Sequence, residues 1–443
     1  MHQHNTRTNA YGKIVFVSLC IAIGAIIIDT SIVKVYRFIT TPVSLDRDIA
    51  TFIVIAIVYA VVQYILLRSV RTETGNSEHF TQNLPHKIVS IIQYVLVALL
   101  VFVILQMLVN QAYNIAIIAI ATTISYGLTI VMTGLLALRF FSWFESTKNT
   151  VVLPYTLAAV ALSINAIFTL VYVVQVLRGV SYIVRPHIGH IGQVGLTPYS
   201  DILNSGYIIT SIVSFLITWI ATILLLRHYS KKIGIAKYWI LVTIPLVYFL
   251  SQFQPIFLNL FSDYRMSNPI LFDVLYTVIF NLSKPIGGIL FGVAFWIAAR
   301  SVHNRPVKDY LRISGYGLLL LFASNQATVL INSPYPPFGM AAVSFVGLSS
   351  YLIYIGIYSS AASVAQDIKL RKSIRDSVER QLDLLRNIGT AQMEKEIMKK
   401  VLNVTKTMSV EISEQTGVEP SLEEQDISDY VDEVIKETRQ TMK

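Results

Sequence analysis

Charged side chains are scarce in this sequence. Aspartate, glutamate, lysine and arginine make up only 14% of the 443 residues, whereas 54% are hydrophobic. A soluble domain carries about 25% charged residues. The composition therefore does not fit a soluble domain, and it indicates a protein whose surface is mostly apolar.

Cysteine is nearly absent too. The single Cys20 can form neither a disulfide within the chain nor a multi-cysteine metal site. His187 and His190 form an H-x-x-H pattern within the segment 178–205, but no third ligand is close in sequence. Catalytic zinc sites usually have three protein ligands. We therefore predict no metal site and no cofactor.

The common catalytic motifs are missing as well. The chain has no G-x-G-x-x-G, Walker A, H-E-x-x-H or G-x-S-x-G pattern, and no apolar run contains a pair of carboxylates. We expect no enzymatic activity. The net charge of +9 does not predict a nucleic-acid partner, because the basic residues concentrate in loops where membrane insertion requires them. Contact with anionic lipid fits those loops.

What the sequence does contain is long apolar runs. Runs of about 20 residues match the thickness of a bilayer, and the short alternating segments of a β-barrel are absent. The sequence therefore predicts an all-α, polytopic membrane helix bundle with about ten transmembrane helices. The predicted spans are 14–33, 50–67, 88–109, 114–138, 151–177, 206–226, 238–259, 270–299, 312–332 and 340–365. We interpret the first as an uncleaved signal anchor.

The distribution of basic residues predicts the orientation. If the N-terminus is cytoplasmic, that terminus and the inner loops carry 15 lysines and arginines, with Arg312 at the start of the ninth span included, and the outer loops carry 6. The positive-inside rule then places both termini in the cytoplasm, in a multi-pass protein of the cell membrane. Residues 1–365 would form the transmembrane bundle, and residues 366–443 a cytoplasmic tail.

The tail carries an apolar stripe at helical spacing. Its members are Leu370, Ile374, Val378, Leu382, Leu385, Ile388, Met393, Ile397, Val401, Val404 and Met408. The stripe must be covered by something. It can pack on the inner loops or remain a solvated end, it can dimerise the protein through a parallel coiled coil, or it can bind a separate cytoplasmic protein. A second, acidic helix is expected after Ser421, which begins a capping-box pattern.

The junction between the last span and the tail, YSSAASVAQD followed by KLRKSIRDSVERQLDLL, resembles the exit helix of membrane-embedded sensor modules. In those proteins the exit helix feeds an output domain. The chain also resembles archaeal multi-span membrane proteins without an assigned activity. The tail departs from histidine kinases because it has no histidine and only two glycines. The resemblance therefore implies a sensor whose catalytic output lies on another chain.

Lys284 is the only basic residue well inside a predicted span. A charge in the middle of a membrane is costly, so it needs a partner or a route to the interface. Asp29, Asp263 and Asp273 are candidate partners. If the helix starts late, the side chain can instead extend to the lipid headgroups.

Polar side chains gather in the outer half of the seventh, eighth and ninth spans. The candidate residues are Gln252, Gln254, Asn281, Ser283, Lys284, Asn325, Gln326 and Thr328. We call this set the outer polar layer. Pro255 and Pro285 each free a carbonyl one turn earlier, among the same residues. Two interpretations remain open: hydrogen bonds that only join helices, or a site for a ligand or ion.

The sequence thus supports two hypotheses. The first is a membrane sensor or signalling scaffold, in which the outer polar layer receives a signal and the tenth span transmits it to the tail. The alternative is a secondary transporter or permease with a site around Lys284. Gly288 and Gly292 form a G-x-x-x-G pattern, which we interpret as helix packing within one chain.

Overall fold

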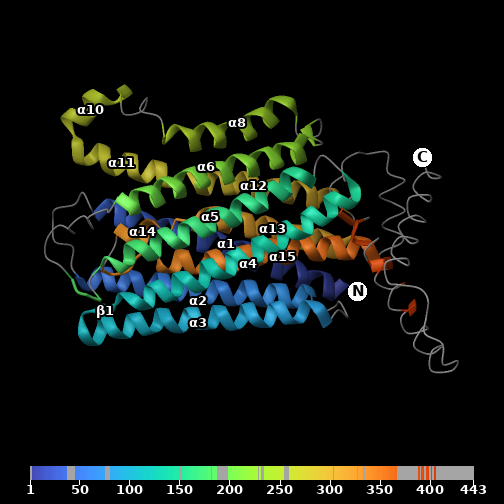
Figure 1. Cartoon of the computed structure of the whole chain (residues 1–443), viewed down its shortest axis with the longest axis horizontal. Helices are drawn as coiled ribbons and strands as arrows, with labels where there is room; N and C mark the ends of the chain where they lie inside the picture. The colour runs from blue at the N-terminus through green and yellow to red at the C-terminus, as the bar shows by residue number, and fades with distance from the viewer. Residues whose placement is uncertain are drawn as a thin grey trace.

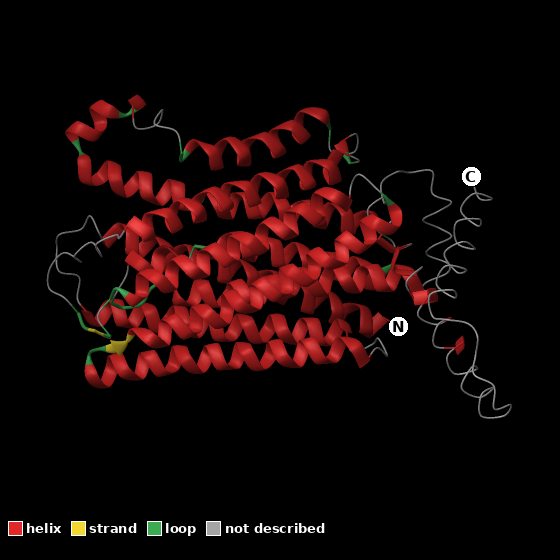
Figure 2. Ribbon diagram, in the orientation of Figure 1, coloured by secondary structure: helices red, strands yellow, loops and turns green. Residues whose placement is uncertain are grey.

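The apolar runs form helices that lie side by side along the long axis of the molecule (Figures 1 and 2). The computed structural model describes residues 2–36, 45–74, 80–148, 152–180, 182–186, 198–227, 229–230, 234–253, 259–302, 304–326, 328–332, 335–366 and short pieces between 388 and 405. The predicted all-α bundle is confirmed for these residues.

The helices follow the predicted spans in order. They are α1 (His2–Tyr36), α2 (Leu45–Thr74), α3 (Phe80–Asn110), α4 (Ile115–Thr147), α5 (Val152–Arg178), α6 (Pro198–Arg227), α8 (Ile235–Ser251), α10 (Ser262–Ser267), α11 (Pro269–Asn281), α12 (Ser283–Ser301), α13 (Arg305–Ser324), α14 (Thr328–Asn332) and α15 (Met340–Gln366). The eighth predicted span is divided between α11 and α12, and the ninth between α13 and α14.

In the part of the chain that the structure describes, nine helical stretches are long and apolar enough to cross a membrane. The seventh predicted span corresponds to the shorter apolar helix α8. α1 begins and α15 ends at the same end of the bundle (Figure 1). We call this the tail end, and the opposite end the loop end.

The outer surface of the bundle is apolar. Ile91, Val109 and Leu138 are 63%, 77% and 67% exposed, and many other large aliphatic side chains face outward. Monomeric soluble proteins rarely expose continuous apolar surface on this scale. The surface therefore has the character that contact with lipid tails requires.

A short pairing closes the loop end. Strand β1 (Tyr113–Asn114) pairs antiparallel with β2 (Ile183–Val184), and the ring of Tyr113 stacks on that of Tyr335 with centroids 5.9 Å apart. Burial raises the pKa of both phenols, so both stay protonated at neutral pH. The loop that precedes α15 is thereby attached to the loop between α3 and α4.

Helices α12, α13 and α15 pack with unusually close backbones. A Cβ atom on Gly292 would lie 2.8 Å from the carbonyl oxygen of Gly315, and one on Gly317 would lie 2.8 Å from that of Ser349. Only glycine permits such approach. The G-x-x-x-G pattern of α12 therefore packs against α13 within the chain, in agreement with its interpretation from the sequence.

Ser125 joins α4 to α15. Its hydroxyl donates to the carbonyl oxygen of Val343 at 2.6 Å and accepts from the amide of Gly347 at 3.1 Å. The hydroxyl thus bridges two backbone groups that normally bond to each other in an α-helix. α4 and α15 are held in register at this point.

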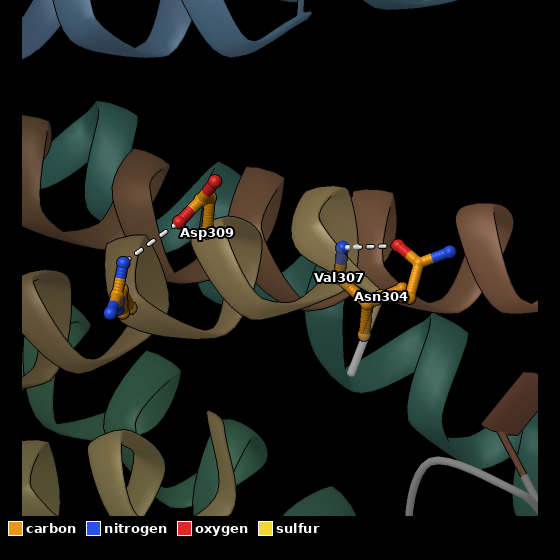
Figure 3. A network of polar contacts seen from close by, with 4 residues as sticks. Asn304, Val307 and Asp309 are labelled. Carbon is orange, nitrogen blue, oxygen red and sulfur yellow. Dashed lines mark hydrogen bonds and ion pairs between the residues drawn. The ribbon is translucent and has the colours of Figure 1, made fainter. Parts of the chain in front are cut away.

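The start of α13 at the tail end is set by its own side chains (Figure 3). The Asn304 side-chain oxygen accepts from the amide of Val307 at 3.3 Å, a typical N-cap. One turn later, Asp309 pairs with Arg312 at 3.0 Å. These polar groups end the apolar part of the ninth span.

Part of the tail contacts this end of the bundle. Ile388 and Ala391 are buried, and Gly389 lies against Val364 of α15. The indole of Trp143 in α4 donates to the side chain of Gln392 at 3.3 Å. The stripe member Ile388 is thus covered by the bundle.

Other members of the predicted stripe are not covered in this way. Ile397 and Val404 are 41% and 53% exposed. Several parts of the tail lie outside the described residues: Leu370, Ile374, Val378, Leu382, Leu385, Met408, the acidic segment after Ser421 and the part of the junction after Gln366. The division between bundle and tail at residue 365 stays a prediction.

We expect Gly292→Ala to destabilise the protein by about 1–3 kcal/mol, because the new methyl group must push the α13 backbone away. The midpoint of thermal unfolding in detergent measures this. Gly127→Ala in α4 is the matched control, since a Cβ there meets nothing within 4 Å. Equal unfolding temperatures for the two variants would contradict the close packing of α12 on α13.

Candidate functional site

The outer polar layer coincides with interruptions in three helices. α8 ends at Ser251, α11 and α12 are separated at Leu282, and α13 and α14 are separated at Asn325 and Gln326. Interrupted helices leave backbone groups without helical partners. In an apolar bundle those groups must be satisfied by neighbouring side chains.

Pro285 causes part of the interruption in the eighth span. It has no amide hydrogen, so the carbonyl of Asn281, four residues earlier, loses its helical donor. The side chain of Gln326 donates to that carbonyl at 3.4 Å. The sequence-based expectation that this freed carbonyl lies among the outer polar residues is confirmed.

Asn281 also reaches helix α1. Its side-chain amide donates to the hydroxyls of Thr30 and Ser31, both at 2.9 Å. Asn281 and Thr30 are buried. Thr30, Ser31, Asn281 and Gln326 form a group that we call the Asn281 cluster.

Asn325 lies next to Gln326 in the sequence, but its side chain forms hydrogen bonds with other helices. Its amide nitrogen donates to the side-chain oxygen of Asn165 in α5 at 3.0 Å, and its oxygen accepts from the Tyr126 hydroxyl in α4 at 2.8 Å. Asn165 in turn donates to Thr210 in α6 at 3.1 Å. These four residues form the Asn325 cluster, which connects α4, α5 and α6 to the interruption in the ninth span.

Sequence reasoning missed the partners of both clusters. Asn165 is a lone amide in the middle of the fifth span. A single amide within an apolar run is a pattern from which a candidate site residue could have been predicted. The other partners carry hydroxyl groups, which are common in membrane helices: Thr30, Ser31, Tyr126 and Thr210. Nothing in their sequence context distinguishes them.

Lys284 pairs with a phenol. Its ammonium donates to the Tyr207 hydroxyl at 3.1 Å and lies 5.2 Å from the centre of the same ring. Tyr207 stacks on Tyr172, with centroids 6.0 Å apart. The amide of Asn165 also reaches the Tyr207 carbonyl at 3.4 Å, so this pair adjoins the Asn325 cluster.

Of the predicted partners, Asp29 is engaged elsewhere. Its two carboxylate oxygens accept from the amides of Gly339 and Ala342, at 2.8 and 3.1 Å. The side chain is fully buried. It therefore caps the N-terminus of α15 from a distant helix.

The remaining predicted residues are peripheral or not described. Ser283 donates to Gln252 at 3.4 Å, and Gln252 donates back to the Phe249 carbonyl at 2.8 Å. Gln254 lies outside the described residues, as do Pro255, His187 and His190, and the side chains of Thr328 and Asp273 are not described. Asn281 and Gln326 meet, whereas Asn325 bonds to other helices, so these residues form two clusters rather than a single layer.

No protein-family model, curated protein or solved structure matches this chain. Its function is therefore argued from its own residues.

We expect Asp29→Ala to lower the free energy of unfolding by about 2–4 kcal/mol, because two buried amides at the start of α15 lose their hydrogen-bond acceptors. Denaturation in detergent micelles measures the loss. Asp201→Ala is the control, since Asp201 is exposed in the first turn of α6. A loss no larger than that of the control would show that Asp29 does not hold α15 in place.

Proposed function

We propose that this protein is a multi-pass sensor or signalling scaffold of the cell membrane, with both termini in the cytoplasm. In this proposal the outer polar layer receives a ligand, an ion or a membrane signal. The tail then passes the resulting movement to a cytoplasmic protein that contacts residues 366–443. Catalytic output is assigned to another chain because the sequence carries no catalytic motif.

The observation that carries the proposal is the contact of the tail with α4. Helix α4 contributes Tyr126 to the Asn325 cluster and Trp143 to the contact with Gln392. Next to Tyr126, Ser125 bonds to the backbone of α15. A change at Asn325 thus has a continuous set of packed contacts through which it can reach the tail.

Helix α15 supports the same route. Its N-terminus is fixed by Asp29 near the loop end, and its other end contacts Gly389 of the tail. The helix is buried along its whole length. Buried, closely packed helices shift as units rather than deforming continuously, which suits a helix that transmits movement.

We expect Asn325→Leu to release the tail. The substitution removes the hydrogen bonds from Tyr126 and to Asn165, which lets α4 move relative to its neighbours. Trypsin should then cut the tail several-fold faster in reconstituted vesicles with the tail exposed. Gln392→Leu, which removes the bond from Trp143, should have the same effect directly.

The matched control is Leu138→Ala on the outward face of α4, where the side chain is 67% exposed. This variant should keep the wild-type cleavage rate. If Asn325→Leu folds and its tail is cut at the wild-type rate, the outer polar layer is not coupled to the tail and the sensor proposal fails.

A permease is the second candidate, and the interrupted spans favour it. Discontinuous helices whose free backbone groups meet polar side chains line the substrate sites of many transporters. Here α11–α12 and α13–α14 are interrupted beside each other, and Gln326 bonds to the freed carbonyl of Asn281. Lys284, two residues beyond the first interruption, would then contact the solute.

If the protein is a permease, Lys284→Met should abolish solute uptake by proteoliposomes while the protein remains folded. A panel of radiolabelled carboxylates and metal cations would be tested first with the wild type. Lys237→Met is the control, because Lys237 is exposed at the start of α8. Uptake that survives in Lys284→Met would remove this mechanism.

A further inference from the structure

Lys284 has no acidic partner among the residues that the structure describes. It makes no ion pair with a carboxylate among the described residues; its one hydrogen bond there is to the Tyr207 hydroxyl. Asp29 caps α15, and Asp201, six residues before Tyr207 on α6, is exposed to the surroundings of the bundle. Neither carboxylate forms an ion pair with the ammonium.

The position of Lys284 makes this charge costly. Tyr207, the hydrogen-bond partner of the ammonium, is only 7% exposed, so the ammonium lies against a buried side chain. It also occupies the second residue of α12, where the helix dipole is positive and disfavours a cation. A bound anion would relieve both effects.

The donors around Lys284 match such an anion. An ammonium group has three donors and no acceptor, and only one of the three is used by Tyr207. The Tyr207 oxygen accepts this bond, which leaves its own hydrogen free to be donated. The ammonium and the phenol thus offer hydrogen bonds side by side, held by the Tyr172 ring and by the Asn165 bond to the Tyr207 backbone.

We propose that Lys284 and Tyr207 bind the anionic group of a ligand, a carboxylate or a phosphate, which reaches them from the loop end of the bundle. The proposal rests on the function proposed above, because it names the chemistry of the ligand that the outer polar layer receives. Two sources supply this chemistry: the headgroup of an anionic lipid and a free carboxylate in solution. Charge-assisted hydrogen bonds of this kind are roughly twice as strong as neutral ones.

The experiment uses purified full-length protein in a neutral detergent. Phosphatidylglycerol, decanoate and the zwitterionic lipid phosphatidylcholine are the probes. The shift in unfolding temperature and the number of bound probe molecules by native mass spectrometry are the readouts. Wild type, Lys284→Gln, Lys284→Arg and Tyr207→Phe are compared, with Lys237→Gln as a control that removes an exposed lysine at the other end of the bundle.

We expect phosphatidylglycerol or decanoate to stabilise the wild type more than phosphatidylcholine does. Lys284→Gln should weaken this binding at least tenfold, Tyr207→Phe should weaken it less, and Lys284→Arg and Lys237→Gln should retain it. A response to phosphatidylglycerol alone identifies the lipid as the source, and a response to decanoate alone identifies a free carboxylate. Lys284→Gln also removes a charge and can change stability by itself. The unfolding temperature of this variant without probe is therefore the reference for its shifts.

The proposal is overturned if neither anion binds the wild type better than phosphatidylcholine, or if Lys284→Gln binds as the wild type does. Binding is read on the purified protein without using the tail. If no anion binds, the proteolysis test of the sensor function is unaffected. If the proteolysis test fails, the binding of an anion at Lys284 can still be measured independently.

Discussion

The need to satisfy backbone groups inside an apolar bundle governs the candidate site. Helices that break within such a bundle expose amides and carbonyls, and no water is present to bond them. Three side chains meet this need: Gln326 bonds the freed carbonyl of Asn281, Asn325 ends α13 while bonding two other helices, and Asp29 accepts from the first amides of α15. Each bond crosses between helices, so the same constraint fixes how the helices are placed.

The centre of the bundle depends on small residues. α13 approaches α12 at Gly315 and α15 at Gly317 so closely that no side chain fits between the backbones. This packing encloses α15 while α2, α3 and α6 expose their aliphatic side chains. The enclosed helix extends from the Asp29 cap to the contact with Gly389, and this gives the proposed sensor a rigid connection between its two ends.

Sequence reasoning identified several residues of the site but not the hydrogen bonds between them. Asn281, Asn325 and Gln326 were predicted to lie near one another because they fall at the same depth in spans of alternating direction. Side chains at equal depth in neighbouring helices can meet. Depth alone could not divide them into two clusters, because the direction of each side chain depends on how its helix is rotated. For the same reason Asp29 was considered as a partner of Lys284, whereas its carboxylate is bonded to the amides of Gly339 and Ala342.

The sequence alone determined the helical class, the order of the spans and the interruption before Pro285, because length, hydropathy and the missing amide of proline are local properties. Only the tertiary structure decided that Lys284 meets Tyr207, that Asn165 and Tyr126 belong to the site, and that Trp143 contacts the tail. These contacts join residues between 77 and 249 positions apart. They depend on the rotation and neighbours of each helix, which no local pattern specifies.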